Sequence, residues 1–484
     1  MVGVRTRGGP GRWQALGLAG SVLLAVGAVG AGVLPKPDPL HDAVVLSTLR
    51  SGAGRVLCIV LAGLGMAALV AAWLALGRVV ERCDLRRLYL TVAIWSAPLV
   101  LAPPILSRDV YAYAVAGKMM RVGLNPYQHG GGDLVSSWVS STSSSWLHVP
   151  FAYGPLFLVL TRLVATVAGN SLAVAVFGMR LVAVAGTVLL AWALPRLARA
   201  CGADERRAVW LGLVNPLVLT HFVGGAHADA LMVGLLVAGL AVAAGRSPVA
   251  GAVLCTLAVA VKATAIVALP FVALLWLAHR QPAHRALLRA VAATTLVAAV
   301  TFAAITALSG VGYGWVTTVD TVGISRQWTS LPTGLGFAIG GIMHAAGAGL
   351  GTDPALAPTR AVALVLTAAV LGWLWLRTAR ARDVRPVLAA CGWALLVVVA
   401  LGPAVHPWYV TWPFVVLAAA GVDGRPRTAV VAASAALCFL VMPDGYNLAL
   451  ATRPVGVWLD VAVTAGVLVW GVRRLARGRQ LVPG

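Results

Sequence analysis

The sequence predicts an all-α polytopic membrane protein, and three observations carry that prediction. Of the 484 residues, 60% are hydrophobic and only 11% are charged, and the mean hydropathy is +0.90. The apolar residues form repeated runs of about 20 residues, the length that crosses a bilayer as a helix. The charged residues, 37 basic and 15 acidic, stand mostly between these runs. This composition is not that of a water-soluble domain.

The apolar runs can be taken in order from the N-terminus. The first, residues 13–34, follows basic residues and is longer than the apolar region of a cleavable signal peptide, so we interpret it as a span. About 14 spans are expected in all. They lie at residues 13–34, 55–77, 88–106, 171–195, 207–222, 229–245, 248–262, 264–278, 286–308, 358–377, 386–402, 408–421, 428–442 and 455–472.

Two further apolar stretches, residues 153–168 and 331–349, are better interpreted as surface or re-entrant helices in outer loops. Counting only one of them as a span would place whole arginine clusters outside the cell, against the positive-inside rule. With both left out, the two termini are cytoplasmic and most of the 37 basic residues lie on the cytoplasmic side of the plasma membrane. Topology therefore explains the net charge of +22, and no nucleic-acid partner is expected.

This topology divides the chain into five parts. They are three N-terminal transmembrane helices (1–106), a first outer loop with surface helices (107–170), a transmembrane core (171–308), a second outer loop with a surface or re-entrant helix (309–357) and C-terminal transmembrane helices (358–484). No convincing repeat relates the two halves, which weakens a transporter interpretation.

The first outer loop opens with a stretch that predicts a helix beside the membrane. Ser107 is placed to cap it, and Asp109 in its first turn suits the positive end of the helix dipole. A period of 3.6 residues puts Asp109 and Tyr113 on one stripe of a helix along the membrane surface, which ends at Gly123. Asp109 is the candidate general base for a reaction on a lipid-linked substrate. The alternative is an ordinary capping aspartate.

Other ionisable residues stand at the expected outer ends of spans: His227, Asp229, Lys262 and His406. An ionisable group near lipid depth costs roughly 2.5–3.5 kcal/mol on insertion scales. At a span end it can reach water, so each can be a tolerated interfacial residue. Their gathering on one face of the membrane favours a common site. His227 and Asp229 are then a polar helix cap, or a hydrogen-bond donor and a second acidic group for that site.

Lys262 and Arg326 are candidate counter-charges for a lipid phosphate, although Lys262 alone could be a lysine that reaches to the interface. Trp408, Tyr409 and Trp412 fit an interfacial aromatic belt, and aromatic faces also suit sugar rings. The sequence has no zinc-protease, serine-hydrolase or phosphate-binding glycine-loop motif, which argues against a protease or an ATP-driven pump. The six cysteines show no spacing typical of disulfides or zinc.

Five stretches, in this order along the chain, resemble a known family. They are SRDVYAYAVAG (107–117), GLNPY (123–127), YGPL (153–156), NPLVLTHFVGGAHADALM (215–232) and HPWY (406–409). They are similar to the GT-C superfamily of polyprenyl-phosphate-sugar-dependent glycosyltransferases. Within it, the chain most resembles the actinobacterial α-(1→6)-mannosyltransferases that build the mannan core of lipomannan and lipoarabinomannan. Members often carry Asn before the aspartate of the fourth stretch, where this chain has Ala228.

The resemblance implies a GT-C-type fold and a defined reaction. Mannose would pass from a polyprenyl-phosphomannose donor to a mannolipid or α-(1→6)-mannan acceptor on the outer face, with inversion. Such a transfer needs one carboxylate base and groups that stabilise the leaving phosphate. Asp109 is expected to be the base, and no cofactor or obligatory metal is expected. The expected substrate-binding residues are Tyr113, Asn125, Tyr127, Tyr153, His227, Asp229, Lys262, Arg326, His406, Trp408 and Tyr409.

Two alternatives stay open at this point. A transporter or flippase for a lipid-linked sugar would also be polytopic, but its polar residues should lie near the middle of the bilayer. Another GT-C enzyme, for arabinose or for a protein acceptor, would share the motifs, because the sugar and the acceptor are selected by pocket shape.

Overall fold

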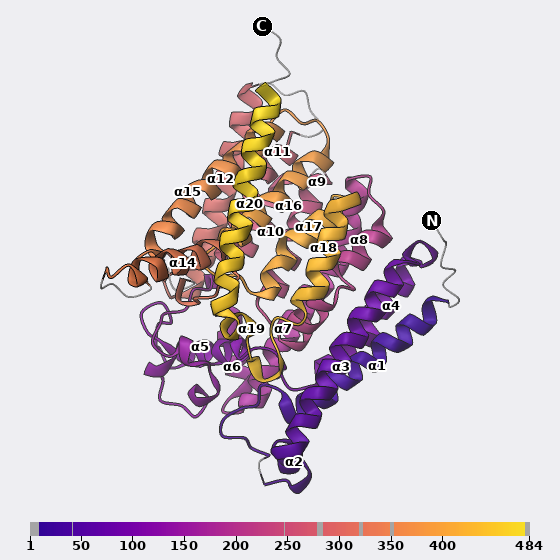
Figure 1. Ribbon diagram of the computed structural model, residues 1–484, viewed down its shortest axis with the longest axis vertical. Helices are drawn as coiled ribbons and strands as arrows, with labels where there is room; N and C mark the ends of the chain where they lie inside the picture. Colours follow the sequence, from indigo (N-terminus) through magenta and orange to yellow (C-terminus); the bar gives the residue numbers. More distant parts are fainter. Residues whose placement is uncertain are drawn as a thin grey trace. The chain divides into compact units, whose positions relative to one another are not determined.

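A computed structural model describes residues 9–40, 42–245, 247–277, 284–318, 323–348 and 353–479. Parts of the expected second outer loop, residues 319–322 and 349–352, and the last residue of the expected span 264–278 lie outside these ranges. Every regular element of the described residues is a helix (Figure 1). The longer ones are α1 (Pro10–Ala31), α3 (Gly52–Gly77), α4 (Leu85–Leu101), α5 (Asp109–Arg121), α6 (Pro155–Ala168), α7 (Leu172–Ala200), α8 (Glu205–Gly212), α9 (Asp229–Ala244), α10 (Pro248–Val259), α12 (His284–Ser309), α14 (Leu331–Ala345), α15 (Leu356–Thr378), α16 (Val384–Ala400), α17 (Thr411–Ala419), α18 (Gly424–Leu437) and α20 (Arg453–Arg479).

The chain folds into two compact units. The larger unit comprises Met1–Thr321, Trp373–Leu396 and Pro407–Tyr446, and the smaller unit comprises Val322–Gly372, Val397–His406 and Asn447–Gly484. In the smaller unit, Phe337 of α14 and Val457 of α20 belong to one small hydrophobic core. Arg360 of α15 lies across the same unit and donates to the carbonyl oxygens of Gly323 and Pro403.

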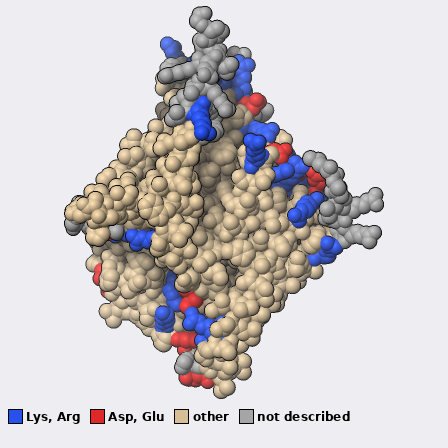
Figure 2. Space-filling model, in the orientation of Figure 1, with Lys and Arg blue, Asp and Glu red and all other residues tan. Residues whose placement is uncertain are grey.

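Helices α1 and α3 of the larger unit pack backbone to backbone. A Cβ added to Gly20 would lie 2.8 Å from the carbonyl oxygen of Gly65, and one added to Gly65 would lie 2.6 Å from the carbonyl oxygen of Gly20. Small residues that allow this approach are typical of helix pairs in membranes. The outer side of α3 exposes large apolar side chains such as Leu57 and Leu64. Much of the surface in Figure 2 likewise carries neither acidic nor basic side chains, as expected for contact with lipid.

Within the described residues, five helices are long and apolar enough to cross a membrane, or six if one bent pair counts as a single span. The membrane class is therefore supported, whereas the expected number of about 14 spans is not confirmed. The physical reason is length, because several of the expected spans form helices of 10–17 residues, such as α10 and α16. At 1.5 Å per residue, a 14-residue helix is about 21 Å long and does not cover a hydrocarbon core of about 30 Å.

The expected helix after residue 106 is present as α5, but its N-terminal cap differs from the prediction. Arg108 is the N-cap, and Ser107 instead accepts a hydrogen bond at 3.1 Å from the backbone N–H of Asp109. Ten of the 13 residues of α5 are buried by the surrounding protein. The helix packs on α6 so closely that a Cβ at Gly117 would lie 2.1 Å from the carbonyl oxygen of Thr161.

The expected spans 207–222 and 229–245 form a broken helix. A π-helical turn, Val218–Gly224, meets α9 at an angle of 115°. The break is Gly225 to Ala228, where Ala226 has a φ of 53°. Non-glycine residues with a positive φ and π-helical turns both occur preferentially at functional sites. The break places His227 and Asp229 at the start of α9, beside α5.

Candidate active site

Asp109 lies at the first residue of α5, where its carboxylate is 17% exposed. The Trp146 indole N–H lies 3.4 Å from Oδ1, and Nε2 of His227 lies 3.6 Å from Oδ2. The carboxylate therefore has a partner on each oxygen and still reaches solvent. A general base needs both access to its substrate and a defined orientation.

His227 is fully buried and its ring orientation is set on three sides. Nδ1 lies 2.7 Å from the carbonyl oxygen of His221, so Nδ1 carries the proton and donates it to this acceptor. Trp408 stacks on the ring at 4.1 Å between centroids. Beneath the ring lies Gly225, where a Cβ would come within 2.7 Å of Cε1 and Nδ1. The remaining nitrogen, Nε2, is therefore held toward Asp109.

Asp229 has a different environment from Asp109, although both are the first residues of helices. It is fully buried, and both of its oxygens accept hydrogen bonds from Nζ of Lys262, at 2.9 and 3.1 Å. The Trp412 indole N–H also donates to Oδ1 at 2.7 Å. The ammonium group of Lys262 lies 4.1 Å from the ring centroid of Tyr409 and 4.8 Å from that of Trp412. A buried pair with such added partners is well compensated.

Two tyrosines lie between the carboxylates. The hydroxyls of Tyr113 and Tyr153 are 3.1 Å apart, and the Tyr127 hydroxyl donates to the carbonyl oxygen of Tyr153 at 2.9 Å. Burial raises the pKa of the Tyr113 hydroxyl well above its ordinary value, and the charges of Asp109 and Asp229 raise it further. Burial likewise raises the pKa of Tyr153. Both phenols are therefore neutral hydrogen-bond donors at physiological pH.

The Tyr-Gly-Pro turn positions Tyr153 against the end of α10. The backbone N–H of Gly154 donates to the carbonyl oxygen of Val261 at 3.0 Å. A Cβ at Gly154 would lie 2.3 Å from the carbonyl oxygen of Ala260, so only glycine allows this approach. Because residue 262 follows directly, the turn also brings Tyr153 to Lys262, whose Nζ lies 5.9 Å from the tyrosine ring centroid.

Arg180 of α7 links the end of α4 to the residue that precedes the helix break. Its side chain is buried and donates to the carbonyl oxygens of Val100 and Ala102 at the end of α4, at 2.8 and 2.6 Å. It also donates to the carbonyl oxygen of Gly224 at 3.0 Å. These carbonyl groups lie at helix ends, where they have no partner within the helix. Arg180 therefore positions the residues that precede His227.

The structure brings most of the sequence-predicted residues together. Asp109, Tyr113, Tyr127, Tyr153, His227, Asp229, Lys262, Trp408 and Tyr409 form one connected set of contacts, here called the Asp109 cluster. Asn125 donates to the carbonyl oxygen of Val311 and accepts from the N–H of Tyr127, and its expected contact with substrate stays a prediction. In the smaller unit, Arg326 pairs with Asp353, and His406 lies 3.4 Å from the Ser325 hydroxyl. Their expected roles at the phosphate stay predictions.

Sequence reasoning did not assign Trp146 and Trp412 to the site, yet each indole N–H faces a carboxylate. From the sequence, Trp412 is interpreted as part of an interfacial belt. The only signal for its role was its spacing of three residues from Tyr409 and four from Trp408, which places the three side chains on one face of a helix. The sequence also did not predict that Lys262 and Asp229 form an ion pair. Among the described residues, no group of three or more His, Cys, Asp or Glu side chains could hold a metal ion.

Comparison with known proteins identifies the family of the chain. Residues 14–278 match the family model described as alpha-(1->6)-mannopyranosyltransferase, N-terminal domain, and residues 332–473 match the MptB C-terminal domain. Alpha-(1->6)-mannopyranosyltransferase A of Mycobacterium tuberculosis is 37% identical over 449 residues, which cover 91% of this chain and 85% of that protein. Alpha-(1->6)-mannopyranosyltransferase B of Corynebacterium glutamicum is 29% identical over 496 residues, covering 95% of this chain and 82% of that protein.

The apolar helical fold, the Asp109 cluster and these matches define a membrane glycosyltransferase. The chain belongs to the alpha-(1->6)-mannopyranosyltransferase family, and its relatives support mannosyl transfer as its activity.

Proposed function

We propose that this protein transfers mannose from a polyprenyl monophosphate donor to a hydroxyl of a mannolipid or α-(1→6)-mannan acceptor, with inversion at the anomeric carbon. The reaction takes place on the outer face of the plasma membrane, and both termini are cytoplasmic. The lipid-linked donor is a substrate, and the proposal includes no cofactor or metal. Chelation with EDTA tests the last point, since the transfer rate should not change.

The observation that carries the proposal is the contrast between the two carboxylates. Asp229 is fully buried and its oxygens are taken up by Lys262 and Trp412. Asp109 is partly exposed, and Nε2 of His227 lies 3.6 Å from its Oδ2. Asp109 is therefore the carboxylate that can receive a proton from an acceptor hydroxyl. Asp229 and Lys262 hold the neighbouring structure.

His227 gives the proton a second place to go. Because Nδ1–H is engaged by the carbonyl oxygen of His221, Nε2 is the ring nitrogen that faces Asp109 and can exchange a proton with it. In the transfer, the acceptor O–H bond breaks and its proton goes to Asp109 while the acceptor oxygen bonds to the anomeric carbon. The bond from that carbon to the phosphate oxygen breaks, and polyprenyl phosphate leaves. Asp109 then passes the proton to Nε2 of His227.

Neutral donors surround the place where the phosphate would leave. Tyr113 and Tyr153 keep their protons and can donate to phosphate or sugar oxygens. Lys262 has its charge compensated by Asp229, so its contribution to the phosphate is weaker than that of a free ammonium. The aromatic faces of Trp408 and Tyr409 suit the sugar ring.

The decisive experiment is sugar transfer by purified protein in lipid, with polyprenyl-phosphomannose as donor and a short α-(1→6) mannoside as acceptor. Asp109→Asn should lower kcat by about 10²-fold or more while donor binding is retained. The matched control is Asp133→Asn, an exposed aspartate of the same loop that pairs with His129, which should behave as the wild type.

An Asp109→Asn variant as active as the wild type would remove Asp109 from the mechanism. Failure of the wild type to transfer mannose, combined with movement of the labelled donor between leaflets, would identify a transporter instead.

A further inference from the structure

A second group of charged residues lies where α3 ends and α8 and α18 begin, on helices of the larger unit. Three cavities open there side by side and share lining residues. Figure 2 shows basic side chains gathered in the region that α8 and α18 occupy in Figure 1. None of these residues belongs to the Asp109 cluster.

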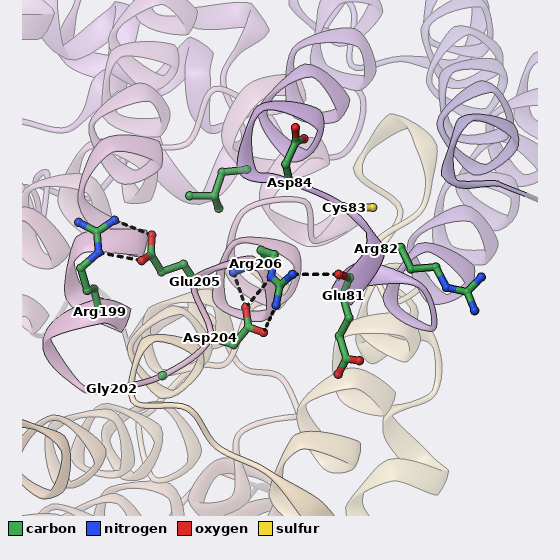
Figure 3. A pocket seen from close by; sticks show the side chains of 11 residues that line it. Glu81, Arg82, Cys83, Asp84, Arg199, Gly202, Asp204, Glu205 and Arg206 are labelled. Atoms are coloured by element: carbon green, nitrogen blue, oxygen red, sulfur yellow. Dashed lines mark hydrogen bonds and ion pairs between the residues drawn. The ribbon is translucent and has the colours of Figure 1, made fainter.

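The largest of these cavities, about 850 Å³, has no excess of basic charge (Figure 3). Three arginines and four acidic side chains line it. Arg199 pairs with Glu205 at 2.7 Å, and Arg206 pairs with Asp204 at 3.0 Å. Because the acidic side chains outnumber the arginines, this cavity has no positive excess with which to attract an anion.

The adjoining groove, about 420 Å³, is different because three arginines line it with one acidic residue, Glu81. Glu81 is bound by Arg207, and Arg427 pairs at 3.0 Å with Asp423 at the rim. Arg78 has no ion pair or side-chain hydrogen bond with any residue that the structure describes. The groove thus has an excess of positive charge directed at an open space.

The wall of this groove is apolar, and close packing holds its side chains in place. Leu74, Trp210 and Val431 line it. Trp210 stacks on Trp73 at 5.3 Å, and each indole N–H donates to the other residue's carbonyl oxygen, at 3.0 and 2.9 Å. A Cβ at Gly77 would lie 2.1 Å from the Trp210 ring, so glycine is required for this packing.

The combination indicates a particular ligand. Leu74 belongs to α3, a helix long and apolar enough to cross a membrane, and Arg78 is its C-cap. A free anion would not gain from contact with an apolar wall, and a neutral lipid would not neutralise the excess arginines. Basic pockets between helices at the membrane boundary suit anionic lipid headgroups. We propose that the groove between α3, α8 and α18 binds the phosphate of an anionic phospholipid, with its acyl chains along Leu74 and Val431.

Native mass spectrometry of the full chain tests this proposal, with phosphatidylglycerol and phosphatidylcholine added separately to the purified protein. The wild type should retain phosphatidylglycerol in preference. Arg78→Gln should weaken that retention about fivefold, and Arg78→Gln/Arg427→Gln should abolish the preference. The matched control is Arg82→Gln, which removes the same charge from the larger, acidic cavity and should retain the lipid as the wild type does.

Three results would overturn the proposal. The first is equal retention of the two lipids by the wild type, and the second is an equal loss of retention in Arg82→Gln. The third is complete displacement of phosphatidylglycerol by about 10 mM inorganic phosphate, which would mean that the lipid binds roughly 10³-fold more weakly than at a nanomolar-to-micromolar site. The last result would mean that the groove binds phosphate from any source. Mannosyl transfer is measured in parallel, and the outcome of each test is independent because Arg78 lies outside the Asp109 cluster.

Discussion

Nε2 of His227 lies 3.6 Å from Oδ2 of Asp109, and the hydrogen bond from Nδ1 to the carbonyl oxygen of His221 sets which ring nitrogen faces the carboxylate. One nitrogen of His227 is thus held against Asp109, the arrangement on which the proposed proton relay depends. The charged and titratable groups around His227 come from several elements: Asp109 from α5, His221 from the π-helical turn, Asp229 from α9 and, through the carbonyl oxygen of Gly224, Arg180 from α7.

His227→Gln should lower kcat about tenfold or more with little change in KM for the donor, because the proton then leaves Asp109 only through solvent. A purely structural role for His227 would change KM and stability but not kcat. Steady-state transfer by both proteins in lipid gives kcat and KM, and thermal unfolding gives the stability. A loss confined to KM and stability would contradict the relay.

Gly225→Ala tests how closely the break is packed under His227. The added Cβ would lie 2.7 Å from the imidazole and 2.8 Å from the carbonyl oxygen of His221, so the ring must move away from Asp109. We expect a loss of activity and about 1–3 kcal/mol of stability. The control is Gly224→Ala, whose Cβ would meet its nearest atom at 3.8 Å and should be tolerated. Equal effects of the two changes would show that the ring position does not matter.

The Lys262–Asp229 pair should be strongly non-additive. The side chains of Lys262 and Asp229 are 10% and 0% exposed. Either Lys262→Met or Asp229→Asn alone leaves the other residue as an unpaired buried charge, which should lower the free energy of unfolding by about 3–5 kcal/mol. The double variant Lys262→Met/Asp229→Asn leaves no buried charge and should recover most of that loss. Thermal unfolding in detergent measures all three variants. Single losses below about 1 kcal/mol that simply add would show that the pair does not act as a unit.

Asp204 should make the stability of α8 depend on pH. Its side chain accepts hydrogen bonds from the backbone N–H groups of Arg206 and Arg207, and the Arg206 side chain holds its pKa below the ordinary 3.8. Because the folded state has the lower pKa, the stabilisation is complete above the unfolded pKa and is lost as the pH falls through the folded pKa.

Asp204→Ala should therefore lose about 1 kcal/mol at pH 7. Asp204→Asn, which keeps the cap without the charge, should lose less and show a weaker fall in stability below about pH 5. Thermal unfolding at pH 7 and pH 4 measures both variants. A steeper acid dependence in Asp204→Asn than in the wild type would contradict this assignment.

The sequence alone predicted the class of fold and much of the site. Long apolar runs indicate membrane helices because no other structure satisfies the backbone in lipid. Asp109 could be singled out from its position after an apolar run, and His227 and Asp229 from their place between two such runs. The number of spans could not be predicted, because run length does not reveal where a helix breaks. The break at Gly225 and Ala226 depends on contacts with distant segments.

What the sequence by itself determined is therefore local: which segments are apolar helices, and which ionisable residues stand at helix ends. Only the tertiary structure decided which of two similar aspartates is accessible. Asp229 is covered because α10 brings Lys262 and α17 brings Trp412 to it, whereas Asp109 meets His227 and stays partly open. The physical reason is that burial and charge compensation arise from residues far apart in the chain, and no local pattern records them.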